Sequence, residues 1–140
     1  MTVPYRNWTS GLGNVGSYQA SSIPYLSSSL EILDSGAVFK ISFPHVTRFV
    51  TVKNIGEEGV SDCLMRVGFS ENGVNDIPDS NYFLLNNQES YSADWRVTAI
   101  YLRVDDPLLT LNATASVIAG VTDILPQDLE WNWTGSIGVG

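Results

Sequence analysis

Residues 109–121 alternate between two kinds of side chain. The odd positions are apolar from Leu109 to Val121, and the even positions are small or polar except for Ile118. A period of two sends successive side chains to opposite faces of an extended chain, so the pattern predicts a half-buried β-strand and excludes an amphipathic helix. The rest of the chain repeats this alternation more weakly.

Seven further strands are predicted where apolar residues alternate between turn signals. They cover residues 18–26, 37–43, 46–53, 63–69, 81–85, 89–95 and 97–104. Pro24 marks the first as an edge strand or a bend. Apolar side chains on both faces of 97–104 predict a central strand. In 46–53, Arg48 falls on the same predicted face as Val50 and Val52, which interrupts the pattern.

The connecting segments carry their own signals. Residues 86–88 have the spacing of a hairpin loop between two strands. Asn72, Gly73 and Pro78 predict a turn-rich loop over residues 70–79. Residues 125–130 are the one stretch with helical character, and Pro126 limits it to about one turn.

About eight strands spaced about ten residues apart are typical of an all-β, antiparallel β-sandwich of the jelly-roll kind, with an up-and-down barrel as the alternative. The sequence predicts this sandwich over residues 18–124. Residues 1–17 and 125–140 are rich in glycine and polar groups and show no such period, so they are expected to form an N-terminal and a C-terminal arm.

The charge composition of the chain limits the kinds of partner that it can bind. The chain has 140 residues, the size of one domain, and a net charge of −8 with seven dispersed Lys and Arg residues. Binding to a phosphate backbone depends on clustered basic residues, so nucleic acid and anionic membrane surfaces are not expected partners. No signal peptide is visible, and no apolar run approaches the roughly 20 residues that span a bilayer.

The sequence offers few reactive groups. His45 is the single histidine, which excludes a site built from several imidazoles, and Cys63 lies in an apolar segment typical of a buried thiol. The spacing of glycines over residues 11–16 resembles a dinucleotide fingerprint but lacks the flanking strand and helix. No acidic segment has the spacing of a calcium loop. We therefore expect no catalytic residue, no cofactor and no metal site.

Aromatic residues are the remaining candidates for binding a ligand or another protein. Those near residues 81–95 are expected to fill the core, with sugar stacking or a protein contact as the alternative: Tyr82, Phe83, Tyr91 and Trp95. Those in the two arms are predicted to contact another subunit, because large apolar side chains on an arm need a surface to cover: Tyr5, Trp8, Trp131 and Trp133.

Five segments carry a resemblance to a known family. They are residues 16–25 (GSYQASSIPY), 40–52 (KISFPHVTRFVTV), 82–86 (YFLLN), 97–102 (VTAIYL) and 115–124 (ASVIAGVTDI). In these segments the chain resembles the small β-sandwich virion structural proteins of tailed bacteriophages. The similar segments are framework motifs and include no active-site signature.

The resemblance implies a non-enzymatic structural protein, in particular a capsid decoration or cement protein that forms a homotrimer. Its expected partners are the major capsid protein and copies of itself. Its expected location is the capsid surface of the virion, after synthesis in the host cytoplasm. The alternatives are a tail, fibre or other virion component, a carbohydrate-binding β-sandwich module and, third, a hydrolase.

Overall fold

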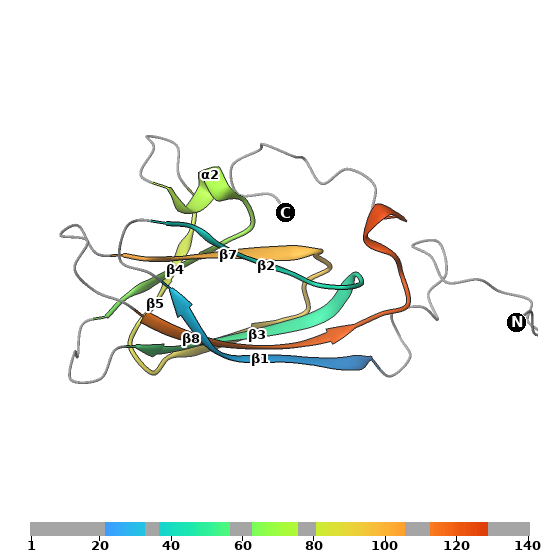
Figure 1. Cartoon of the computed structure of the whole chain (residues 1–140), viewed down its shortest axis with the longest axis horizontal. Helices are drawn as coiled ribbons and strands as arrows, with labels where there is room; N and C mark the ends of the chain where they lie inside the picture. Colours follow the sequence, from blue (N-terminus) through green and yellow to red (C-terminus); the bar gives the residue numbers. More distant parts are fainter. Residues whose placement is uncertain (1–21, 33–36, 57–62, 76–80, 106–112, 129–140) are drawn as a thin grey trace, which may run out of the picture.

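Two four-stranded sheets lie face to face (Figure 1). The computed structural model describes residues 22–32, 37–56, 63–75, 81–105 and 113–128. The first sheet has the order β1 (Ile23–Ile32), β8 (Ala113–Val121), β3 (Thr47–Gly56), β6 (Ser90–Ala93). The second has the order β2 (Phe39–Ser42), β7 (Ala99–Val104), β4 (Met65–Gly68), β5 (Phe83–Leu85).

The strand pairing is nested. β1 pairs with β8, β2 with β7, β3 with β6 and β4 with β5, all antiparallel. This is the pairing of one long antiparallel ribbon that has been rolled up, and the contacts β3–β8 and β4–β7 join the turns of the roll. Eight strands so arranged form a jelly roll. The predicted all-β sandwich is therefore confirmed, and the barrel alternative is wrong because the strands form two separate sheets.

The alternating strand of the sequence is β8, which lies between β1 and β3 at the centre of the first sheet. Its inward side chains are at most 3% exposed, whereas Ile118 on the other face is 46% exposed. Three of the inward residues are alanines, and the facing sheet supplies larger side chains to fill the space. The larger residues are Met65, Leu85, Ile100 and Leu102.

A β-bulge corrects the prediction for Arg48. Thr47 pairs with Val121 and Phe49 pairs with Gly120, so two steps along β3 match one step along β8 and Arg48 is the extra residue. A bulge restarts the alternation out of phase. Arg48 is therefore exposed, while Val50 on the same strand is fully buried.

The predicted hairpin at residues 86–88 is wrong. β5 pairs with β4 and β6 pairs with β3, so the segment between them crosses from the second sheet to the first. The crossing is a tight turn in which Glu89 N donates to Asn86 O at 3.0 Å and Gln88 has a φ of 66°. Short spacing between two strands predicts a turn, but it does not decide which strands pair.

The predicted loop at 70–79 contains a short helix, α2 (Glu71–Val74). Ser70 caps its first turn, since its hydroxyl accepts a hydrogen bond from Gly73 N at 3.0 Å. The helical turn expected at 125–130 is confirmed as the 3-10 turn η1 (Pro126–Asp128). β1 lies at the edge of its sheet, as Pro24 predicts, but extends to Ile32 rather than ending at Leu26. Residues 1–17 lie outside the described residues.

A buried asparagine connects the two sheets. Asn54 in β3 is fully buried, and its Nδ2 donates to Cys63 O at 2.8 Å and to Leu85 O at 3.1 Å. Its Oδ1 accepts from Gly56 N at 2.8 Å. Because Leu85 belongs to the second sheet, one amide side chain links strands from both layers.

Replacing Asn54 with alanine is expected to lower the free energy of unfolding by about 3 kcal/mol, because the change leaves buried backbone groups without partners. Urea denaturation should show a lower midpoint with an unchanged slope. The neighbouring exposed Lys53 provides the control, since Lys53→Ala should change stability by less than about 0.5 kcal/mol. Equal effects of both changes would contradict the assigned role.

Candidate functional site

The outer face of the first sheet carries an exposed apolar pair. Leu26 on β1 and Ile118 on β8 are direct cross-strand partners, 66% and 46% exposed. The same row continues through Thr51 on β3 to Ser92 on β6, whose hydroxyl groups share a 2.7 Å hydrogen bond. Adjacent exposed apolar side chains of this size on a rigid sheet are typical of a contact surface.

The adjoining row has no charged side chain either. Pro24 and Phe49 pair with Gly120 from its two sides, and a Cβ at Gly120 would collide with the Phe49 ring. The absence of a side chain at Gly120 lets the Phe49 ring approach the strand closely. We call these two rows the uncharged face; its residues are Pro24, Leu26, Phe49, Thr51, Ser92, Ile118 and Gly120.

The outer face of the second sheet is different, because two arginines lie opposite each other. Arg66 on β4 and Arg103 on β7 are cross-strand partners and are only 9% and 8% exposed. Like charges in directly opposed positions repel one another. The surrounding groups must therefore compensate for two neighbouring cations that are largely removed from water.

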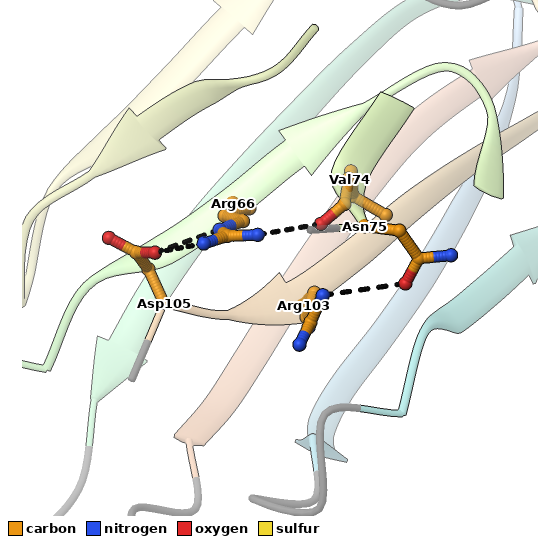
Figure 2. A network of polar contacts seen from close by, with 5 residues as sticks. All are labelled: Arg66, Val74, Asn75, Arg103 and Asp105. Carbon is orange, nitrogen blue, oxygen red and sulfur yellow. Dashed lines mark hydrogen bonds and ion pairs between the residues drawn. The ribbon is translucent and has the colours of Figure 1, made fainter. Parts of the chain in front are cut away.

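Oxygen atoms of the surrounding residues contribute to this compensation (Figure 2). Asp105 Oδ1 accepts from Arg66 Nε at 2.8 Å and lies 2.6 Å from Nη2. Arg66 Nη1 donates to Val74 O at 3.0 Å, and Arg103 Nη1 donates to Asn75 Oδ1 at 3.4 Å. The guanidinium of Arg66 also lies over the Tyr82 ring, 4.5 Å from its centroid.

These contacts attach α2 to the outside of the second sheet, where Figure 1 shows it above β4 and β7. Val74 is fully buried there, and a Cβ at Gly68 would come within 2.7 Å of its Cγ1. The glycine thus lets the helix approach closely. The arginine pair anchors a covering element, so a structural role accounts for its burial.

Aromatic side chains close the open side of the sandwich between the edge strands β5 and β6. The Tyr91 ring stacks on Trp95 with centroids 5.6 Å apart, and Phe83 contacts Tyr91 at 5.2 Å. Phe83 and Trp95 pack against the core, as predicted. For Tyr91 and Tyr82 the core prediction is wrong, because they are 50% and 37% exposed at the sheet edge.

A hollow of about 250 Å³ lies at the end of the sandwich where β3 begins and β8 ends. Its buried lining residues are Val46, Thr47, Thr122 and Ile124. Its exposed lining residues are Arg48, Asp94 and Arg96. Arg48 reaches this position because it is the extra residue of the bulge in β3.

The predicted interface residues Tyr5, Trp8, Trp131 and Trp133 all lie outside the described residues. Cys63 is fully buried, as its apolar segment predicts, and His45 is half-buried in the bend between β2 and β3. The described part of the chain contains no group of three metal-ligating side chains. It also contains no helix with the length and apolarity needed to span a membrane.

The uncharged face was not among the sites predicted from the sequence. One signal was available, since Ile118 is the apolar exception on the polar side of β8. Its exposed partner Leu26 could not be found in the same way, because only the register of β1 against β8 brings the two together.

No protein-family model matches the sequence, and no curated protein matches it. Among solved structures, the chain is similar to the coat protein of Tobacco streak virus, with a TM-score of 0.38 and 13% identity over 80% of this chain and 96% of that chain. The jelly-roll assignment therefore depends on the strand pairing of this chain alone.

Removing the carboxylate beside the arginine pair is expected to destabilise the fold. Asp105→Ala should lower the free energy of unfolding by about 3 kcal/mol, the lower end of the range for a broken buried ion pair, because the Asp105 side chain keeps 23% exposure. Adding Arg66→Met to this variant should recover part of the loss, since it removes the opposed like charge. Chemical denaturation of the two single variants and the double variant measures the coupling.

Asp123 provides the matched control because it is an exposed acid. Asp123→Ala should change stability by less than about 0.5 kcal/mol. An Asp105→Ala variant as stable as this control would mean that the ion pair contributes nothing to the fold.

Proposed function

We propose that this chain is a non-enzymatic structural protein of a tailed-phage virion, specifically a capsid decoration or cement protein on the outer shell. It binds the major capsid protein and copies of itself, as a homotrimer, on the capsid surface. Its action is mechanical. Small interfaces repeated by symmetry bury apolar area worth roughly 25 cal/mol per Å² before entropic losses, and so join neighbouring shell subunits.

One observation carries the proposal: the uncharged face, with its exposed pair Leu26 and Ile118. The pair lies on β1 and β8, whose backbones are fixed by sheet pairing, so little order must be gained on binding. Jelly rolls also occur in viral capsid proteins, as well as in lectins and cupins. This likeness of fold is an analogy that agrees with the sequence resemblance; the surface supplies the physical argument.

The arms are the second part of the proposed contact. Tyr5 and Trp8 in the N-terminal arm, and Trp131 and Trp133 in the C-terminal arm, are the side chains that we propose to bind neighbouring subunits. Aromatic residues dominate the energies of protein interfaces because they bury large areas at low entropic cost.

Charges placed on the uncharged face should abolish attachment to the shell. Leu26→Glu combined with Ile118→Lys puts opposite charges at directly paired positions, which the sheet tolerates, but burying them in an interface is costly. We expect at least a tenfold loss of affinity, measured by cosedimentation of the purified chain with shells stripped of the native protein. Ser42→Glu, on the exposed outer side of β2, is the control that should bind normally.

Normal cosedimentation of the Leu26→Glu, Ile118→Lys variant, with an unchanged melting temperature, would exclude this face as the shell contact. Copy number separates the proposed decoration protein from a tail or fibre component. Quantitative mass analysis of whole particles should give hundreds of copies for decoration and at most dozens for a tail part.

A carbohydrate-binding module is the second candidate, and the half-exposed Tyr91 ring stacked on Trp95 is the observation in its favour. Aromatic rings exposed at a sheet edge are suited to stacking on sugars. Glycan-array binding that disappears in a Tyr91→Ala variant would support this candidate over the virion function.

A further inference from the structure

The two threonine hydroxyls on the floor of the hollow at the start of β3 already have hydrogen-bond partners within the chain. The Thr47 hydroxyl donates to Trp95 O at 2.6 Å and accepts from Val97 N at 3.1 Å. The Thr122 hydroxyl donates to Val46 O at 2.7 Å and accepts from Ile124 N at 3.2 Å. With both hydroxyls engaged, and with Val46 and Ile124 beside them, the floor favours an apolar occupant.

The rim of the hollow is charged, in contrast to the apolar floor. Arg48 and Arg96 face the hollow with one acid, Asp94, and all three residues are exposed. The local excess of positive charge contrasts with the net charge of −8 of the whole chain. Two guanidinium groups against one carboxylate leave the rim with a net positive charge, so it suits an acidic partner.

The volume of the hollow favours a single side chain over a small molecule as its occupant. Clefts for drug-sized ligands enclose about 300–1,000 Å³, and this hollow, at about 250 Å³, is smaller. It is suited to one large apolar side chain with acidic residues beside it. Tryptophan and arginine are enriched among the residues that contribute most to protein interfaces, and such residues sit in well-packed pockets.

We propose that the hollow binds residues 128–133 of the C-terminal arm of a second copy of this chain. That segment reads Asp128, Leu129, Glu130, Trp131, Asn132, Trp133, and so combines two acids with two indoles. The N-terminal arm also carries aromatic residues, but its single charged residue is Arg6, which the arginine rim repels. Charge therefore selects the C-terminal arm.

The hollow and the C-terminal arm are neighbours in the sequence. Ile124 lines the hollow, and the turn η1 begins two residues later, at Pro126. We assign the bound segment to a second copy, and the state of association tests this, because an arm bound to the hollow of its own copy leaves a monomer.

This inference deepens the proposed function, because it names the site and the arm through which copies of the chain associate. Sedimentation velocity of the full-length chain tests it without any shell. Arg48→Glu with Arg96→Glu reverses the rim, and Asp128→Lys with Glu130→Lys reverses the arm. Each variant alone should weaken self-association at least tenfold, and an equimolar mixture of the two should associate more strongly than either variant alone.

Lys40→Glu with Lys53→Glu is the matched control, because it changes the net charge by the same amount at exposed positions away from the hollow. It should associate like the unaltered chain. Three results would overturn the inference: an unaltered chain that is monomeric throughout, rim reversal without effect, or a mixture that stays dissociated. The shell assay is independent, so the chain can fail here and still bind the shell, or associate here and fail to bind it.

Discussion

Within the described residues, the fold depends on the pairing of the first strand, β1, with the last, β8. β8 lies between β1 and β3, and its backbone completes the hydrogen bonding of both neighbours. Its inward side chains are alanine and valine, which leave room for the larger buried residues of the other sheet. A strand that arrives last in sequence and occupies the centre of a sheet makes the contacts long-range, and such topologies fold slowly because loop entropy is lost before contacts form.

Local alternation predicted the fold class because strands such as β8 and β3 have one buried face, and burial of one face leaves a period of two in the sequence. It predicted β8, the central position of β7 and the edge position of β1. It failed where pairing overrides the local pattern. The bulge at Arg48 is caused by register against β8, and the crossing at residues 86–88 is caused by two strands that belong to different sheets.

Surface sites are harder to predict than cores because they too depend on how the strands pair. A core residue is constrained by its own burial, whereas the uncharged face exists only when β1, β8 and β3 are brought into register. The same holds for the opposed Arg66 and Arg103, which are far apart in sequence and meet only across β4 and β7. Of the predicted contact residues, the four in the arms stay predictions, because they lie outside the described residues.

The two outer faces of the sandwich are not equivalent, and this difference has a consequence for assembly. The second sheet is covered by α2, which is held by buried charge and by the close approach at Gly68. The uncharged face of the first sheet has no such anchoring charge and presents Leu26 and Ile118. In the proposed function, attachment to a shell and association between copies then use separate parts of the molecule. In that proposal the sheet face binds the shell, and the hollow at the end of the sandwich binds a neighbouring arm.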